Sequence, residues 1–335
     1  MAITKIPAAG FTGNNFRNII INGDMSIAQR GTSTASITSG GYYTVDRFQF
    51  EPSSLGTWTM SQSTTIPTGQ GFTTSLKLDC TTADASPASG DLLALQQRIE
   101  GQNLQYLKKG TSNAESLTLS FWVQSNKTGT YICELRDLDN SRIINKSYTI
   151  SSADTWEKKT ITFAGDTSGV LDNDSGASLY VRWWLGAGTD YTSGTLQTSW
   201  DSSTNANRAV GQVNLADDTA NEFYITGVQL EAGTTASDFE FLPYDVNLQR
   251  CQRYYIKLNS EIYGNNNYAG TNTSLQNYYM FREVMRAAPT ITVGTPHNWS
   301  SGPTAASATS DGFRIYGAGG NVYIDSPGYI ANAEL

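Results

Sequence analysis

Regular alternation of apolar and polar residues over positions 117–163 is the feature that most constrains how this 335-residue chain folds. The first run places Leu117, Leu119, Phe121 and Val123 on one side, and a polar turn at 126–129 follows it. Further runs separated by polar turns continue to Phe163. A period of two predicts antiparallel strands with one buried and one solvated face. Such a sheet presents side chains and does not by itself suggest a reaction.

Similar strand patterns occur elsewhere in the first two thirds of the chain, at 47–50, 57–62, 75–80 and 179–185. Within 223–230 the apolar residues change phase at Gly227, which predicts a β-bulge that turns both halves inward. Roughly eight to ten strands in two antiparallel sheets predict an all-β fold, a jelly-roll β-sandwich. One short helix is expected inside this region, near 92–99.

The chain divides into four predicted parts. Residues 1–22 form an extended N-terminal attachment arm, 23–244 the jelly roll, 245–258 a linker helix, and 259–335 a smaller C-terminal β domain. In the last part, the glycine-rich segment 317–320 predicts a hairpin turn between two short strands.

The predicted linker helix has an apolar stripe. Leu248, Cys251, Tyr255 and Leu258 fall on one helical face because they follow the spacing of a coiled-coil seam. Two arrangements fit this stripe. In the first, the helix docks on its own domain. In the second, three copies meet around a symmetry axis, and these four residues form the oligomer contact.

The acidic composition disfavours two classes of partner. With 22 basic and 30 acidic residues the formal net charge is -8, whereas proteins that neutralise nucleic-acid phosphates or an anionic membrane surface are expected to be basic. No apolar run approaches the roughly 20 residues that span a bilayer, and the first residues lack the apolar core of a signal peptide. We therefore expect no nucleic acid, no membrane insertion and no export signal. Cys80, Cys133 and Cys251 form no disulfide framework, and Cys133 is predicted to be a buried free thiol.

Catalytic and metal-binding motifs are scarce. His297 is the only histidine, in a loop-like segment, so a zinc site built on several histidines is excluded and any nucleophile–histidine pair must use this residue. No glycine-rich phosphate-binding motif is present. We expect no catalytic residue and no cofactor. The turn carboxylates of 172–174 and 217–218 leave a structural calcium ion open, although they lack EF-hand spacing.

Aromatic residues give a better indication of function. The chain has seven Trp and 18 Tyr, whose rings suit stacking on sugars. Trp183 shares the parity of the core positions and is predicted to be buried, whereas Trp122, Tyr180 and Trp184 have the opposite parity, which leaves their exposure open. Core packing or a subunit interface is the alternative for each ring. The candidate receptor- or glycan-binding residues are Trp299, Tyr268, Tyr191 and Trp200.

Several segments, taken in order, resemble a family of phage tail-fibre proteins. These segments are 22–31 with 46–48, the strands 119–163, 223–233 with Phe239, 251–255, 285–290 and 331–335. The strands resemble the carbohydrate-binding-module-like jelly roll of that family, and the last two segments resemble its terminal β domain. The resemblance covers most of the chain from residue 14 onward and carries over no catalytic residue.

The resemblance implies a virion protein, a homotrimer on the tail or another projecting fibre, assembled in the host cytoplasm. It implies attachment to a glycan or receptor on the host cell surface, and multivalent binding strengthens such attachment. The N-terminal arm is expected to contact other virion tail or fibre proteins. Two alternatives remain open: a capsid-decorating or tail connector protein without receptor binding, and a polysaccharide depolymerase that uses two carboxylates.

Overall fold

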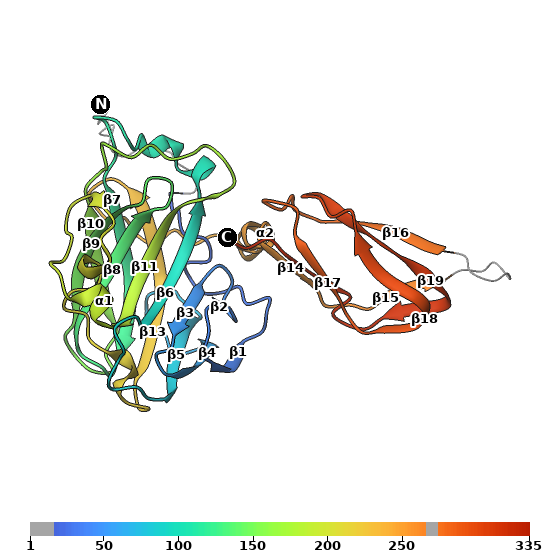
Figure 1. Cartoon of the computed structure of the whole chain (residues 1–335), viewed down its shortest axis with the longest axis horizontal. Coiled ribbons are helices and arrows are strands. Elements are labelled where there is room, and N and C mark those ends of the chain that lie inside the picture. Colours follow the sequence, from blue (N-terminus) through green and yellow to red (C-terminus); the bar gives the residue numbers. More distant parts are fainter. Residues whose placement is uncertain (1–16, 266–273) are drawn as a thin grey trace, which may run out of the picture.

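The structure, a computed structural model, describes residues 17–265 and 274–335. They form an all-β protein in two parts (Figure 1): a β-sandwich of two antiparallel sheets, and a smaller C-terminal β domain that projects from it. Helix α2 (Tyr244–Gln252) lies where the two parts meet. Among these residues, no helix is both long and apolar enough to cross a membrane. The predicted all-β sandwich is confirmed.

Six strands form one sheet of the sandwich, in the order β1-β4-β5-β13-β7-β10. Their bounds are β1 Ser33–Ile37, β4 Thr57–Ser63, β5 Ser75–Thr82, β13 Glu222–Ala232, β7 Leu117–Ser125 and β10 Glu157–Phe163. Seven strands form the other sheet, in the order β12-β9-β8-β11-β6-β3-β2. Their bounds are β12 Asp201–Ser202, β9 Arg142–Ile150, β8 Gly129–Asp137, β11 Ala177–Ala187, β6 Leu92–Glu100, β3 Gln49–Ser53 and β2 Gly41–Tyr42.

Short helical turns occupy the connections of the sandwich, and two small sheets build the C-terminal domain. The turns are α1 Thr189–Thr192 and the 3-10 turns Gly101–Asn103, Gln105–Leu107, Asn205–Asn207 and Leu215–Asp217.

The first small sheet of the C-terminal domain has the order β14-β20-β17, with β14 Tyr255–Leu258, β20 Tyr329–Asn332 and β17 Thr290–Val293. In the second, β15 Ile262–Asn265, β16 Ser274–Met280 and β18 Pro296–Ala306 all pair with β19 Gly312–Ile324.

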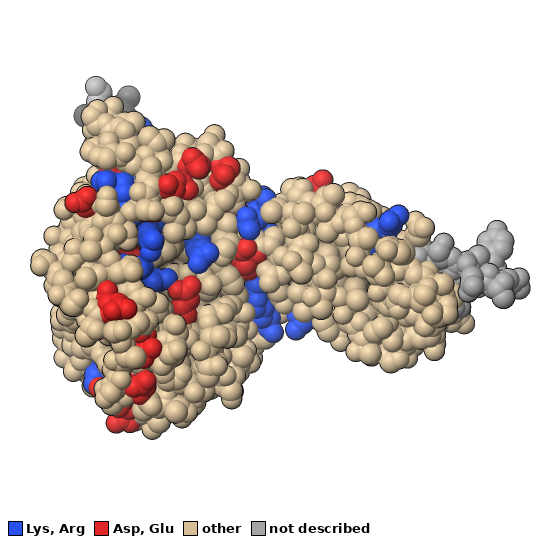
Figure 2. All heavy atoms as spheres, in the orientation of Figure 1, with Lys and Arg blue, Asp and Glu red and all other residues tan. Residues whose placement is uncertain are grey.

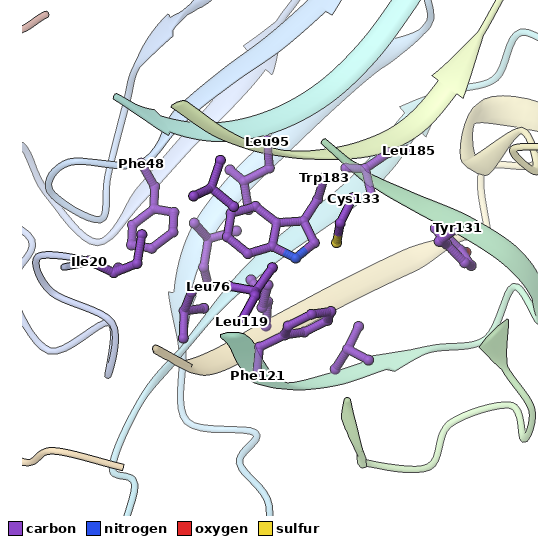
Figure 3. Close-up of a cluster of buried hydrophobic side chains, with 14 of the residues drawn as sticks. Ile20, Phe48, Leu76, Leu95, Leu119, Phe121, Tyr131, Cys133, Trp183 and Leu185 are labelled. Atoms are coloured by element: carbon purple, nitrogen blue, oxygen red, sulfur yellow. The ribbon is translucent and has the colours of Figure 1, made fainter. Parts of the chain in front are cut away.

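The main core lies between the two sheets of the sandwich, with Trp183 among its largest members (Figure 3). The Trp183 ring is fully buried, and the ring centroids of Phe121 and Phe48 lie 5.8 and 6.5 Å away. Leu119 and Cys133 belong to the same cluster, and Cys133 is a buried free thiol as predicted. Because burying one such large side chain contributes about 1.5–3 kcal/mol, the alternating strands supply most of the stabilisation.

Residues 17–22 run into the sandwich. Ile19 and Ile20 belong to its core, and the Ile19 N–H donates to the Leu230 carbonyl at 2.9 Å. The Asn18 side chain donates to the Val228 carbonyl at 3.0 Å. This part of the predicted arm therefore lies along the main domain, while its residues 1–16 fall outside the described ranges.

The predicted bulge at Gly227 is confirmed. The register between β13 and β7 shifts between Thr226 and Gln229, and Gly227 has a φ of +61°. Phe223, Ile225, Val228 and Leu230 are all buried as a result, although the two pairs differ in parity. Glycine is favoured here because other residues rarely adopt this backbone conformation.

The helix predicted near 92–99 is wrong, since this segment is strand β6. It lies between β11 and β3, and residues 93–97 are buried in succession. In a strand that is buried on both faces, apolar residues no longer alternate with polar ones. The spacing of Leu92, Leu95 and Ile99 then imitates a helix, because a short buried run has no distinctive period.

The linker helix predicted for 245–258 is too long. Helix α2 ends at Gln252, and Tyr255–Leu258 form β14, which pairs with β20. Tyr255 and Ile256 favour an extended backbone, and pairing with β20 satisfies their peptide groups. The four stripe residues Leu248, Cys251, Tyr255 and Leu258 therefore do not lie on one helix face.

Residues of the predicted stripe pack inside their own subunit. Cys251 and Tyr254 form a buried cluster with Ile21 and Ile27, and Leu248 packs against it. This is the packing expected of a helix that docks on its own domain.

The hairpin predicted at 317–320 is also wrong, because β19 runs through it without a turn. The strand pairs with β18 along one edge, and with β16 and then β15 at successive parts of the other edge. A Cβ atom on Gly317 would lie 2.6 Å from the Trp299 ring. This glycine thus permits a close approach between neighbouring strands. Close approach is a common role of glycine in a sheet, besides its role in turns and bulges.

Candidate functional site

A row of polar side chains crosses the outer face of the seven-stranded sheet. Gln49, Gln96, Arg182, Glu134 and Asn145 lie directly opposite one another on β3, β6, β11, β8 and β9. Because successive side chains alternate between faces, the register of five strands places all five on the side away from the core. We call this set the polar row.

One half of the polar row is fixed by Arg182. Its guanidinium donates to Gln96 Oε1 at 2.9 and 2.6 Å and to Glu51 Oε2 at 2.6 Å. The Gln96 amide in turn donates to Gln49 Oε1 at 2.7 Å and to Glu51 Oε1 at 2.9 Å. Gln49 and Glu51 are half-buried, so they form the accessible border of this half.

The other half is fixed by Arg208, which reaches the sheet from the 188–213 segment. Arg208 donates to both oxygens of Glu134, at 2.9 and 2.8 Å, and to the Tyr180 hydroxyl at 2.7 Å. The Tyr180 hydroxyl donates to Glu134 Oε1 at 2.6 Å. Burial alone would raise the pKa of Glu134, but the adjacent Arg208 charge outweighs it and lowers the pKa. Burial raises the pKa of Tyr180 to about 12.

Aromatic rings lie beside the polar row, and two guanidinium groups pack over one of these rings. The guanidinium carbons of Arg182 and Arg208 each lie 5.1 Å from the Trp184 ring centroid. Tyr191, on α1, places its ring 5.3 Å from that of Trp184 and is half-buried. The parity of Tyr180 and Trp184 left their exposure open, and the structure buries both. The segment that carries Tyr191 and Arg208 folds over them, which strand parity does not reveal.

Four buried polar atoms of this face lack a hydrogen-bond partner within the described part of the chain. They are Arg98 Nε, Arg136 Nε, Asn145 Oδ1 and Trp184 Nε1. Arg98 and Arg136 lie on either side of Tyr180 in register and are half-buried. Figure 2 shows acidic and basic side chains close together over the middle of the sandwich. Buried polar atoms are normally satisfied by protein, ordered water or a ligand.

Trp200 lies at a different place, beside a buried ion cluster. Its indole N–H donates to the Ala164 carbonyl at 2.7 Å, and the Lys109 ammonium lies 4.9 Å from its ring centroid. Lys109 pairs with Asp166 at 2.9 Å and also with Asp137. Trp200 is half-buried and stabilises the sandwich at this point, away from the polar row.

Trp299 belongs to the C-terminal domain and lies in strand β18, not in a loop. Its indole N–H donates to the Tyr323 carbonyl at 3.2 Å, and the side chain packs on the core of that domain. His297, on the same strand, bonds to Asp325 at 2.7 Å and stacks on the Tyr323 ring. The structure thus separates Trp299, Trp200 and Tyr191 into three places. Tyr268 lies outside the described residues.

The turn carboxylates considered for calcium bind the chain's own donors. Asp174 accepts the Gly176 N–H at 2.8 Å, and Asp217 accepts the Asn221 amide at 2.7 Å. No group of three or more His, Cys, Asp or Glu suited to a metal ion is found in residues 17–265 and 274–335.

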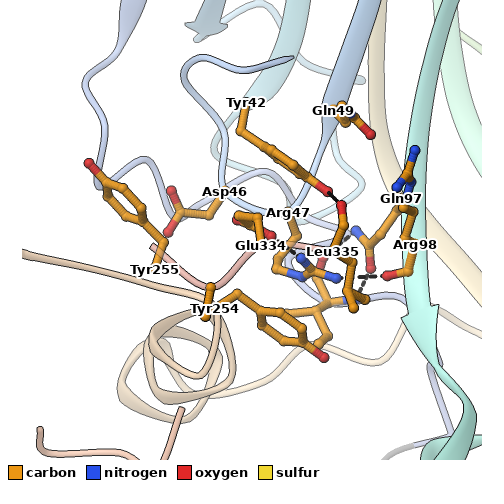
Figure 4. A network of polar contacts seen from close by, with 12 residues as sticks. Tyr42, Asp46, Arg47, Gln49, Gln97, Arg98, Tyr254, Tyr255, Glu334 and Leu335 are labelled. Carbon is orange, nitrogen blue, oxygen red and sulfur yellow. Dashed lines mark hydrogen bonds and ion pairs between the residues drawn. The ribbon is translucent and has the colours of Figure 1, made fainter. Parts of the chain in front are cut away.

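The sandwich and the C-terminal domain are joined by a network of buried charges (Figure 4). Arg47 is fully buried, pairs with Glu334, and donates to the Arg98 carbonyl at 2.7 Å. Its guanidinium carbon lies 3.4 Å from the Tyr254 ring centroid. Arg30 pairs with Glu334 at 3.2 Å. Sequence reasoning missed this network, although four of the segments that resemble tail fibres, 22–31, 46–48, 251–255 and 331–335, meet in it.

No family model matches the sequence, and no curated protein matches it either. Among solved structures, the enzymatically active domain of tailspike protein 4 of bacteriophage CBA120 is similar with 14% identity and a TM-score of 0.33, over 65% of this chain and 22% of that chain. The C-terminal family 22 carbohydrate-binding module of Clostridium thermocellum Xyn10B is similar with 12% identity and a TM-score of 0.30, over 62% and 98%. The TmCBM61 module in complex with β-1,4-galactotriose is similar with 10% identity and a TM-score of 0.30, over 64% and 99%. Because these identities and TM-scores are low, the similarities say nothing about the ligand of this chain, which has to be argued from its own residues.

Proposed function

We propose that this protein is a non-enzymatic structural component of a phage virion, on the tail or another projecting fibre, that attaches the particle to the host surface. It assembles as a homotrimer in the host cytoplasm and binds a cell-surface glycan. The outer face of the seven-stranded sheet is the proposed sugar-binding surface, with Gln49, Glu51, Arg136 and Tyr191 at its accessible border.

The observation that supports this function best is the group of four partnerless polar atoms on a face of otherwise fixed donors and acceptors. A sugar presents several hydroxyl groups that each donate and accept, so it binds well to amides, carboxylates and guanidinium groups held in place beforehand. The contacts of Arg182 and Arg208 hold the polar row in this way. A sugar bound above the row reaches the partnerless atoms through water.

Exposed apolar side chains around α2 support the proposed trimer. Phe241, Tyr244 and Val284 are 50%, 64% and 58% exposed. Clustered apolar exposure of this kind is typical of association surfaces. Three linked copies of a weak sugar site then gain about 10²–10⁴ in avidity without any new contact.

Sugar binding by a designed variant tests the surface. Arg136→Ala removes a half-buried side chain whose Nε has no hydrogen-bond partner among the described residues, so folding should be unaffected. We expect it to weaken binding on an oligosaccharide array and on host cells by about five- to tenfold, the effect of one lost hydrogen bond. Lys158→Ala, on the exposed side of β10 in the other sheet, is the matched control and should bind normally.

Three other measurements test the remaining parts of the function. Light scattering should give three times the subunit mass, and the soluble protein should block phage adsorption. Release of reducing ends from host polysaccharide would assign the protein to the depolymerases instead. Failure both to bind cells and to block adsorption would favour a connector or decorating protein.

A further inference from the structure

Four guanidinium groups lie on the outer face of the seven-stranded sheet, with fewer carboxylates to balance them. They belong to Arg98, Arg136, Arg182 and Arg208. Glu51 lies 3.9 Å from Arg98 and 2.6 Å from Arg182. Glu134 lies 2.8 Å from Arg208, and Glu100, at the end of β6, already pairs with Arg253 at 2.7 Å. One guanidinium group of this face is therefore without a counter-charge.

Arg136 is this unpaired cation. Its side chain forms no ion pair and no hydrogen bond with any residue in the described part of the chain. Along the register its neighbours are Tyr180 on β11 and Ile143 on β9, and Asp201 follows on β12. Because neighbouring strands lie about 4.8 Å apart, the backbone of Asp201 is about 10 Å from that of Arg136. The Asp201 carboxylate instead accepts the N–H of Ser202 at 2.7 Å.

Only the end of the Arg136 side chain is open to a ligand. Tyr180 and Ile143 are both buried, so the stem of Arg136 lies between two covered neighbours. Its Nε atom is shut off from solvent, whereas its two Nη atoms, which also have no partner among the described residues, are not. Because the stem is confined, the guanidinium group loses little freedom when a ligand binds.

A guanidinium group presented end-on suits a carboxylate. Its two Nη groups donate in parallel to the two carboxylate oxygens, which combines charge with two hydrogen bonds. One spare positive charge balances one carboxylate, whereas a phosphate monoester carries about 1.5 to 2 negative charges near pH 7. Neutral hydroxyl groups need no spare charge, because the amides and paired ions of the polar row already offer them donors and acceptors.

We propose that this face selects glycans that contain a carboxylated sugar, and that Arg136 binds the carboxylate. This selectivity rests on the proposed glycan-binding function and narrows its ligand to one class of sugar. The neutral sugars of the same glycan lie over the polar row, where Gln49 and Glu51 form the accessible border.

Matched pairs of oligosaccharides test the charge requirement. Chains that contain glucuronate or galacturonate are arrayed beside the same chains after reduction of each carboxyl group to a primary alcohol. We expect the full-length protein to bind at least one acidic chain about tenfold more tightly than its reduced partner, the effect of one charge-assisted contact. This ratio should shrink as NaCl rises from about 0.05 to about 0.5 M.

Two substitutions at Arg136 separate its charge from its donors. Arg136→Gln keeps N–H donors but removes the charge, so the preference for acidic chains should disappear while the affinity for reduced chains changes by less than about twofold. Arg136→Lys keeps the charge but loses the parallel donors, so part of the preference and its salt dependence should remain. Lys158→Gln makes the same charge change at an exposed position of β10 and should leave both affinities unchanged.

The other outcomes separate this selectivity from glycan binding itself. Equal binding of acidic and reduced chains, or a preference that survives Arg136→Gln with the fold intact by circular dichroism, would overturn the role of Arg136 while the proposed function stands. A phosphorylated oligosaccharide that binds more tightly than every carboxylated chain on the array would also overturn it. If no chain of any kind binds, the proposed function fails together with the selectivity.

Discussion

Asp46 shows how burial at the junction between the sandwich and the C-terminal domain raises the pKa of a single side chain. The carboxylate is buried, accepts from the Gln29 N–H at 3.0 Å, and lies 3.5 Å from Arg30. Burial raises its pKa from an ordinary 3.8 to about 7, although Arg30 and Gln29 oppose the shift. The folded protein therefore takes up a proton here that the unfolded chain releases at much lower pH.

This difference makes stability depend on pH with a definite sign. Between about pH 4 and 7 the folded state holds more protons at Asp46 than the unfolded state, so the free energy of unfolding falls as pH rises, by up to about 1.4 kcal/mol per pH unit. Asp46→Asn removes this contribution. We expect urea unfolding of the variant to show a smaller loss of stability between pH 5 and pH 7 than the wild type.

Titration of other acidic side chains does not hide the contribution of Asp46 to the pH dependence of stability. The pKa of Glu134 is lowered, so its stabilisation is lost only as pH falls below the ordinary range of a glutamate. The comparison between wild type and Asp46→Asn cancels such shared contributions. Identical pH slopes for the two proteins would show that the folded Asp46 carboxyl titrates normally.

Single elements show what the sequence determines and what it does not. β7 to β10 were predictable because apolar and polar residue types alternate along them, and this pattern remains in the sequence even where both faces are buried, as in β7 and β8. β6 was taken for a helix because its residues 93–97 are buried in succession and apolar side chains, Leu93 and Ala94 among them, lie on both of its faces. The ends of α2 and the path of β19 depend on pairing with β20 and β16, partners distant in sequence. Pairing between segments that are far apart in the sequence leaves no recognisable pattern in the residues of either segment.

The candidate site depends on the same long-range register. Tyr191 was selected from the sequence as a loop aromatic, and in the structure it lies beside Trp184 on the outer face of the seven-stranded sheet. The polar row was missed because Gln96, Arg182 and Glu134 become neighbours only when three strands align. The local signal was limited to a few polar residues at alternate positions, Tyr180 and Arg182 on β11 and Glu134 and Arg136 on β8.

Strand β13 gives a prediction at the scale of the element. Alanine at Gly227 combines an unfavourable positive φ with a Cβ that would lie 2.5 Å from the Phe72 ring. We expect Gly227→Ala to lower the free energy of unfolding by about 2–4 kcal/mol, the sum of backbone strain and overpacking. Urea unfolding at constant pH measures the loss.

A matched glycine separates the two causes. Gly233 also has a positive φ, of +112°, but a Cβ there would meet nothing within 4 Å. Gly233→Ala should therefore show the backbone strain alone, about 1–2 kcal/mol. Equal losses for the two variants would mean that Phe72 moves aside without cost.

At the scale of the whole molecule, distant parts of the chain meet at the junction of sandwich and C-terminal domain. Arg47 follows the first strands, Tyr254 follows α2, and Glu334 follows β20, yet the three side chains are in contact (Figure 4). Arg286 adds a bond from the C-terminal domain to the Ser175 carbonyl of the sandwich at 3.1 Å. The two parts are therefore held by several independent contacts.

Glu334→Gln tests the strength of this connection. The variant leaves Arg47 buried without its counter-charge, which typically costs about 3–5 kcal/mol. We expect faster hydrogen exchange in β14 and β20, while the sandwich core stays protected. Glu261→Gln, at an exposed position of the same domain, should leave exchange unchanged. Unaltered protection in Glu334→Gln would show that the ion pair does not hold the domains.

The anchoring of the C-terminal domain has a mechanical consequence. In the proposed role on a phage fibre, an attached particle is pulled by flow and by its own diffusion, and that force passes from one domain to the next. Arg47 and Arg30 of the sandwich pair with Glu334 next to β20, and Arg286 bonds to the Ser175 carbonyl of the sandwich, so tension is shared among several bonds loaded in parallel. Such a junction resists bending, so the orientation of the C-terminal domain follows that of the sandwich.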